Sequence, residues 1–134
     1  MNRELRAAFT ARLSRFRVTD DRDTYDDKTW PAPWVVIDWP PLLEEHARWE
    51  DSNRNRVTGR VQTNCVGLDT DQALALHDAV SGLLLDWVPS VAGWSCFPLS
   101  MATTPRLLSP YRAAPDRVLL TAVCLWEFQA NRLY

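Results

Sequence analysis

One junction near the middle of the chain constrains the fold more than any other feature: a strand-like segment meets a helix-like segment at a single glycine. The junction lies in RVQTNCVGLDTDQALALHDAV, residues 60–80, with Gly67 at its centre. Residues 56–66 alternate between apolar and polar side chains, which is typical of a strand with one buried face. A helix is expected to follow, because Asp69 and Gln72 form a capping-box pattern before an apolar stripe with helical spacing.

This junction is expected to be structural, although a glycine before a helix N-terminus can bind an anion. Asp69 and Asp71 already place negative charge at this terminus. The segment also lacks the glycine density and the lysine of a phosphate-binding loop. The stripe that follows gives the helix a sufficient reason to form without a ligand. It consists of Ala73, Leu76, Val80, Leu83, Leu84 and Trp87.

The remaining pattern predicts a second helix and three more strands. The helix is expected at 3–16, and the strands at 34–39, 94–101 and 117–131. In the last strand, one side is expected to carry Val118, Leu120, Ala122, Cys124, Trp126 and Phe128. Segments 20–33, 40–55 and 103–116 are rich in proline or charge and are expected to be loops.

This order of elements predicts the fold class. We expect one domain spanning residues 1–134, with an α+β fold. Its sheet would be mostly antiparallel, with about four strands and with two helices packed on one face.

Composition excludes several classes of protein. The chain has 15 basic and 17 acidic residues, and a net charge of −2 argues against a chain built to attract nucleic acid. The N-terminus is charged and no apolar run approaches the length of a membrane span, so neither a signal peptide nor a membrane helix is expected. Three cysteines, Cys65, Cys96 and Cys124, are far apart and are expected to be reduced core thiols.

Few residues suggest catalysis or metal binding. His46 and Glu50 are four apart in a polar segment, but two ligand types do not make a metal site. His77 lies beside the apolar stripe of the central helix, and Ser95 and Cys96 have no histidine near them in sequence. We therefore expect no enzyme, no metal and no cofactor. A small enzyme using His46 or His77 stays open as an alternative.

Aromatic and arginine side chains suggest protein contacts instead. The seven tryptophans are Trp30, Trp34, Trp39, Trp49, Trp87, Trp94 and Trp126. A core of this size does not readily hide all of them, and tryptophan and arginine are favoured at protein interfaces. The alternative is that they pack loops onto the sheet of a single subunit.

The motifs resemble a known family over nearly the whole chain. They are the Pro-bounded strand PAPWVVIDWP, the segment R-V-x-x-N-C-V-G followed by D-x-D-Q-A-L-A-L-H-D-A-V, and G-W-S-C-F-P-L. The sequence resembles the tail terminator proteins of long, non-contractile-tailed phages, especially those of actinobacterial hosts and prophages. These are also called tail completion or minor tail proteins. The likeness is strongest over residues 60–84 and 93–99.

This resemblance implies a structural virion protein rather than a catalyst. Subunits would form a ring, usually hexameric, that caps the tail tube, ends its polymerisation and presents a head-joining surface. The partners would be further copies of the chain, the major tail tube protein and a head-completion or connector protein. DNA would pass through the lumen without specific binding, and the protein would assemble in the host cytoplasm. Another head–tail connector ring is the nearest alternative function, and a nucleic-acid module using the arginine-rich helix is a more distant one.

Charge segregation suggests which residues would touch a neighbour. A basic N-terminal helix precedes an acidic loop, and the two could pair within one chain or between chains. The residues expected there are Arg3, Arg6, Arg12, Arg15, Asp20, Asp21 and Asp23. The resemblance further implies that the long loops face the tube or the head, and the contact residues expected outside the N-terminal region are Trp49, Arg54, Arg56, Arg106 and Arg112.

Overall fold

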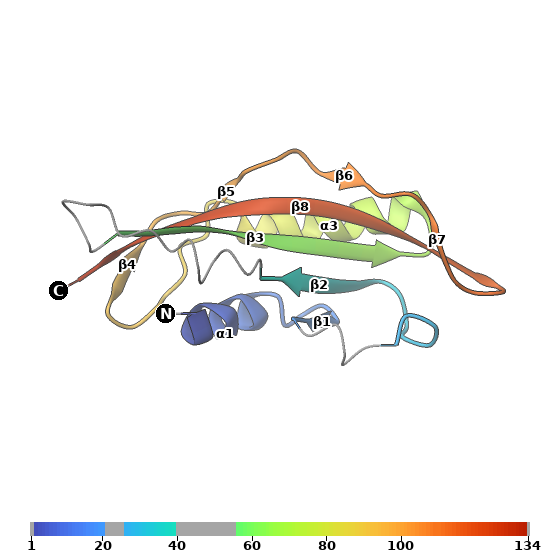
Figure 1. Ribbon diagram of the computed structural model, residues 1–134, viewed down its shortest axis with the longest axis horizontal. Coiled ribbons are helices and arrows are strands. Elements are labelled where there is room, and N and C mark those ends of the chain that lie inside the picture. Colours follow the sequence, from blue (N-terminus) through green and yellow to red (C-terminus); the bar gives the residue numbers. More distant parts are fainter. Residues whose placement is uncertain (1, 21–25, 40–55, 134) are drawn as a thin grey trace.

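A computed structural model describes residues 2–20, 26–39 and 56–133. Two long antiparallel strands form the spine of its sheet (Figure 1). They are β3 (Arg56–Gly67) and β8 (Arg117–Arg132), which pair along the whole of β3. On the other side of β3, β2 (Trp34–Asp38) pairs antiparallel, and β1 (Val18–Thr19) then runs parallel to β2.

The opposite side of β8 is covered by four short strands in succession. They are β4 (Trp94–Cys96), β5 (Ser100–Met101), β6 (Arg106–Leu107) and β7 (Tyr111–Ala114), each antiparallel to β8. Each of the three gaps between them contains a proline, which has no N–H to donate to the ladder. The prediction of one strand at 94–101 and of a loop at 103–116 is therefore wrong. Residues 94–114 form one interrupted edge of the sheet.

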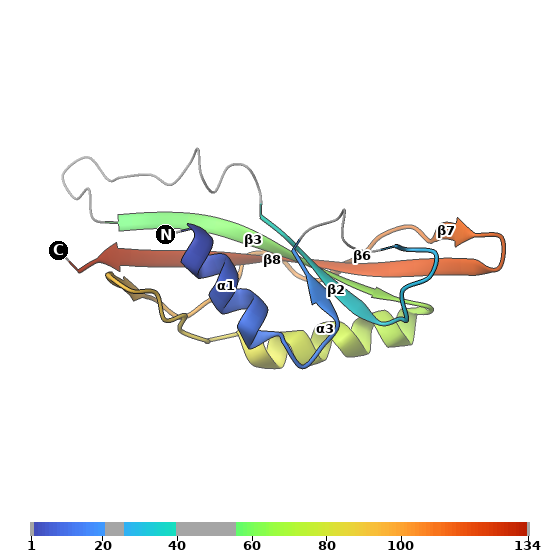
Figure 2. The same ribbon diagram turned by 90° about the horizontal axis from the view of Figure 1, so that it is seen from below.

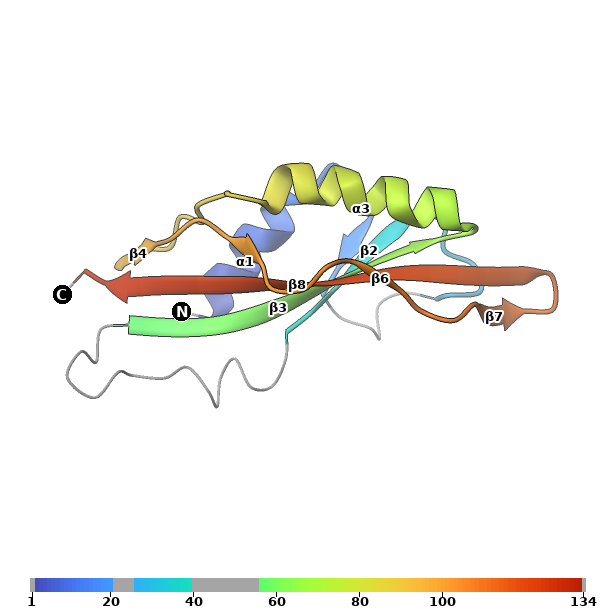
Figure 3. The same ribbon diagram turned by 90° about the horizontal axis from the view of Figure 1, so that it is seen from above.

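The predicted architecture is also wrong. Within the described residues the sheet has eight strands rather than about four, and it is mixed because β1 and β2 are parallel. It is not a flat layer with two helices on one face, because it curls into a half-barrel (Figures 1 and 3). The twist between neighbouring strands accumulates along strands as long as β3 and β8, which favours such curling.

Two helices of the described segments contribute side chains to the core inside this curl. The helices are α1 (Asn2–Arg12) and α3 (Thr70–Leu84), and α3 lies along β3 and β8, while α1 lies beside β1 and β2 (Figures 2 and 3). Neither helix of the described segments is long and apolar enough to cross a membrane. The buried residues of this core include Leu5, Phe9 and Leu13 of α1 and its C-terminal turn, Leu76, Val80 and Leu84 of α3, and Cys124, Trp126 and Phe128 of β8.

Helix α1 is held between the ends of β2 and α3. Phe9 makes edge-to-face contacts with Trp39 and Trp87, at centroid distances of 5.1 and 5.2 Å. The Arg12 guanidinium lies 5.5 Å from the Trp87 ring, and its Nε donates to the Leu83 carbonyl oxygen at 2.9 Å. Arg12 thus supplies a cation and a donor at the C-terminus of α3, whose last turn contains no basic residue.

The predicted strand–glycine–helix junction is confirmed as a structural feature. Asp69 caps α3 by accepting from the Gln72 backbone N–H at 2.7 Å, and the Gln72 side chain accepts from the Leu68 N–H at 2.7 Å. A Cβ atom on Gly67 would lie 2.7 Å from the Ala73 backbone nitrogen. Only glycine lets the end of β3 approach the first turn of the helix this closely.

A second, smaller core lies on the outer face of the sheet. It joins Trp34 and Val36 of β2, Val66 of β3, Ala113 of β7 and Leu119 of β8. Because of this cluster, the beginning of β8 buries a residue on the face opposite the predicted apolar side. Val118 is exposed, whereas the neighbouring Leu119 is buried in the second core.

Candidate assembly surfaces

The strongest candidate for an interaction surface is an arm formed by β6, β7 and the first three residues of β8, residues 106–119. Gly67, the last residue of β3, pairs with Leu120, so residues 117–119 of β8 pair with β7 alone. Consequently the β7–β8 hairpin extends beyond both β3 and α3 (Figures 1 and 3).

Polar contacts tie the β7–β8 hairpin to the body. Arg117 donates to the carbonyl oxygens of Lys28, at 3.1 Å, and of Trp30. Its guanidinium also lies 5.6 Å from the Trp34 ring. The Tyr111 hydroxyl donates to a carboxylate oxygen of Asp27 at 2.6 Å. These contacts position the hairpin as a fixed projection.

The arm carries apolar and basic side chains at its surface. Four of the nine large apolar residues that are exposed in the described segments belong to it, namely Leu107, Leu108, Tyr111 and Val118. Arg112 is exposed on one face of the arm, and Arg106 is exposed on the opposite face. Exposed apolar groups rimmed by charge are typical of protein-binding surfaces.

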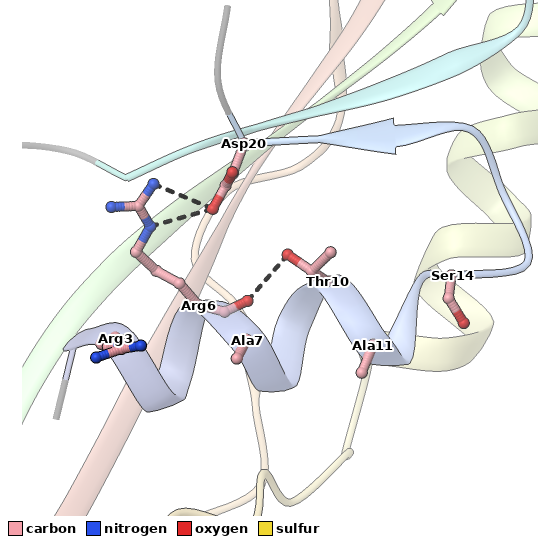
Figure 4. Close-up of a pocket in the computed structure, with 7 residues that line it drawn as sticks. All are labelled: Arg3, Arg6, Ala7, Thr10, Ala11, Ser14 and Asp20. Atoms are coloured by element: carbon pink, nitrogen blue, oxygen red, sulfur yellow. Dashed lines mark hydrogen bonds and ion pairs between the residues drawn. The ribbon is translucent and has the colours of Figure 1, made fainter. Parts of the chain in front are cut away.

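The predicted interface residues of the N-terminal region behave differently. Arg6 forms an ion pair with Asp20 of the same chain, with Nε and a terminal nitrogen each 3.1 Å from one carboxylate oxygen (Figure 4). Arg3 and Arg6 line an open hollow of about 730 Å³ along α1, together with Thr10, Ser14 and Asp20. Among the described residues that line it there is one carboxylate and no histidine or cysteine, so these residues do not assemble groups for acid–base or nucleophilic chemistry.

Other predicted contact residues are distributed over the molecule. Arg12 is tied to α3 as described above, and the Arg15 guanidinium lies 4.9 Å from the Phe16 ring. Arg106 and Arg112 both belong to the arm, but they lie on its opposite faces, because Arg106 pairs with Val123 and Arg112 pairs with Val118. The rest fall outside the described residues or side chains, namely Asp21, Asp23, Trp49, Arg54 and the side chain of Arg56, as does the pair His46 and Glu50.

The tryptophans are placed mainly in the two cores. Trp34 and Trp126 are fully buried, and the other four described ones pack against the core clusters. The indole of Trp126 donates to the Thr63 hydroxyl at 3.0 Å. Leucine, valine and tyrosine provide the exposed apolar surface of the arm instead. Arg117 and Tyr111 were not predicted as functional residues, because their partners at 27–34 are distant in the sequence.

The histidine and the thiols of the described segments are not poised for catalysis. His77 is buried and its Nε2 lies 3.1 Å from the Ser81 hydroxyl, rather than pairing with Ser95 or Cys96. Burial lowers the pKa of His77, although nearby Asp78 opposes the shift. Burial raises the pKa of Cys65 to about 12 and that of Cys124 to about 11, so both thiols stay protonated at neutral pH. Within residues 2–20, 26–39 and 56–133, no cluster of candidate ligands could hold a metal ion.

Comparisons with known proteins give the fold and no activity. No family model and no curated protein matches the chain. A solved structure designated only by a reference number is similar over 100% of this chain and 97% of its own, with a TM-score of 0.61 and 16% identity. At this identity the likeness concerns the fold alone.

Proposed function

We propose that this protein is a structural subunit of a ring that caps the tail tube of a long, non-contractile-tailed phage. The ring would end tube polymerisation and offer the surface to which the head joins. The sequence motifs described above support this assignment. The structural observation that carries the proposal is the projecting arm, because a fixed apolar and basic projection is suited to grip another protein.

The shape of the subunit also supports a ring. The arm lies at one end of the long strand β8. Other exposed apolar residues lie outside the arm, namely Leu85, Val88 and Phe97. Different contact surfaces on one subunit favour head-to-tail association, which closes into a ring when the rotation between neighbours allows it. A protein that binds through a two-fold axis would instead use the same patch on both partners.

The acidic balance fits a lumen through which DNA passes. A net charge of −2 provides no general attraction for the phosphate backbone. In this proposal DNA slides past the ring, and the affinity lies between protein subunits.

Electron microscopy of the purified protein, alone and mixed with tubes of the major tail protein from the same phage, tests the proposal. We expect closed rings, or caps at one end of the tubes, and tubes that stop growing once the protein is added. Binding to head portals without binding to tube ends would instead identify a head-side connector. Tubes that elongate at an unchanged rate in excess protein would refute the capping role.

A further inference from the structure

The arm has one face that the body leaves uncovered. In β8, Ala122 and Cys124 point into the main core, while Leu119 points into the smaller core on the other face. Val118 therefore lies on the inner face, the one that α3 covers farther along the strand. Arg112 pairs with Val118, and Leu107 pairs with Ala122. Directly paired residues point to the same side of a sheet, so Arg112 and Leu107 also lie on the inner face.

This inner face continues past the end of α3. The helix begins at Thr70, beside the end of β3, and the hairpin extends farther (Figure 3). Val118 is 36% exposed past the end of the helix, and Leu107 is 39% exposed on the edge strand β6, beside Ala122, so apolar area stays in water at both places. A helix from another molecule would complete this cover.

The outer surface of α3 has the complementary character. Residues 71, 75, 78, 82 and 85 recur at intervals of three and four, and all are exposed. They place the carboxylates of Asp71 and Asp78 on a surface that also carries two small residues, Ala75 and Gly82. A Cβ on Gly82 would meet no atom within 4 Å, so this part of the helix is open to close approach.

Charge distinguishes the two surfaces. The helix α3 contains no lysine or arginine, and within the described part of the chain neither Asp71 nor Asp78 forms an ion pair with a basic side chain. The arm face carries Arg112, whose guanidinium reaches the Pro115 carbonyl oxygen at 2.6 Å and is otherwise exposed. A basic, apolar ribbon thus matches an acidic helix surface with room for its side chains.

We infer that the inner face of the arm, formed by Leu107, Arg112 and Val118, docks on the outer face of α3 in a second copy of this chain. The two surfaces are different, so the contact is heterologous and propagates from subunit to subunit. The inference deepens the proposed ring and rests on it for the biological role. The contact itself concerns only copies of this chain.

A charge swap provides the test, with association measured by native mass spectrometry and analytical ultracentrifugation of the full chain. Arg112→Glu and Asp78→Lys are each expected to weaken association about 100-fold, because like charges then face each other across the contact. A chain carrying both substitutions is expected to regain most of it. Val118→Glu is expected to cause a comparable loss of association. Because this variant keeps Arg112 and its hydrogen bond to Pro115, such a loss cannot come from a disturbed turn at Pro115.

Arg106→Glu is the matched control. Arg106 pairs with Val123, so it lies on the outer face of the same arm. We expect this variant to associate like the natural chain. Equal losses from Arg106→Glu and Arg112→Glu would overturn the assigned face, as would a swap that fails to rescue.

Mixing two defective subunits tests the head-to-tail geometry. The Arg112→Glu chain keeps a functional α3 face, and the Asp78→Lys chain keeps a functional arm. In their mixture the two substituted side chains have opposite charges and would attract each other, so the uncharged variant Val118→Asn, which keeps Arg112, replaces Arg112→Glu in this experiment. We expect Val118→Asn and Asp78→Lys chains to form a 1:1 dimer that grows no further, because Arg112 then faces the introduced lysine at the unused contact, whereas each chain alone stays monomeric.

The outcomes separate this contact from the ring function. Normal tube capping by Arg112→Glu and Val118→Glu chains would overturn the contact and leave the capping role standing. Oligomers that are lost in the single variants and regained in the charge-swapped chain, but that never cap tubes, would support the contact and refute the capping role. A natural chain that stays monomeric at every concentration, with and without tubes, would overturn the contact.

Discussion

Asn64 shows how a single polar side chain can be buried in this fold. The alternation of β3 places it on the face expected to be wet, yet it is only 5% exposed. Its amide donates to the Val36 carbonyl oxygen and to a carboxylate oxygen of Asp38, each at 3.0 Å, and it accepts from Gln62 at 2.8 Å. Burial is tolerated here because the side chain is well hydrogen-bonded.

We predict that Asn64→Ala lowers the free energy of unfolding by about 1–3 kcal/mol, because it leaves buried acceptors without their donor. Urea denaturation followed by tryptophan fluorescence measures this. Gln62→Ala removes only one hydrogen bond from the rim of the same network and is expected to cost less. Equal costs for the two variants would contradict this account of Asn64.

His77 should make the stability depend on pH. Its pKa is lowered in the folded protein, chiefly by burial, so the unfolded chain binds a proton more readily than the folded chain. The resulting stability is present above the ordinary histidine pKa of about 6.5 and is lost as the pH falls below it. We expect the melting temperature to fall between about pH 7.5 and about pH 5.5, and to fall less in His77→Leu. Parallel pH profiles for the two proteins would contradict the prediction.

Alanine substitution at two glycines of the helix α3 region is expected to change stability for two different reasons, one steric and one conformational. Gly67 precedes the helix, where a Cβ would overlap the Ala73 nitrogen, whereas Gly82 is exposed within the helix and has open space around it. Gly67→Ala is expected to destabilise the protein by about 1–3 kcal/mol through overpacking. Gly82→Ala is expected to stabilise it by about 0.5–1 kcal/mol, because alanine favours helix. Thermal and urea unfolding would check both, and a tolerated Gly67→Ala would show that the junction can relax.

The interrupted edge shows how prolines shape a whole element. Pro98, Pro105 and Pro110 fall between successive short strands along β8. Backbone bonds persist in each gap, from Phe97 to Gln129, Ala102 to Leu125 and Leu108 to Thr121. An edge broken in this way is a poor template for adding a further strand. This favours contacts through side chains, as in the docking of the arm.

Charge pairing across a repeated contact has a consequence for the assembled molecule. Between about 0.1 M and about 1 M sodium chloride the screening length falls from about 10 Å to about 3 Å. We expect the assembled fraction to decrease over this range in sedimentation velocity experiments. The melting temperature of the subunit should change little, because the Arg6–Asp20 pair is exposed and contributes at most about 1 kcal/mol. Assembly that strengthens steadily with salt would contradict an electrostatic contribution.

The sequence by itself determined the local elements. Periodicity predicted a helix capped by Asp69 with an apolar stripe reaching Trp87, and strands at 34–39, 56–66 and 117–131, because these patterns depend on neighbours within one or two turns. The structure has these elements at 70–84, 34–38, 56–67 and 117–132. The sequence pattern wrongly extended the first helix to residue 16, whereas α1 ends at Arg12. It also wrongly predicted a loop at 103–116, because short strands interrupted by prolines show no clear hydrophobic periodicity.

Only the tertiary structure decided how these elements meet. Sheet curl, the pairing of residues 94–114 with β8 and the second core around Trp34 depend on contacts between residues far apart in the chain. The same holds for the candidate surfaces: Arg106 and Arg112 were predicted, but Arg117 and the acidic face of α3 were not. Whether a charged side chain is tied within its subunit, like Arg6 and Arg12, or faces outward, like Arg112, is set by what the fold places beside it.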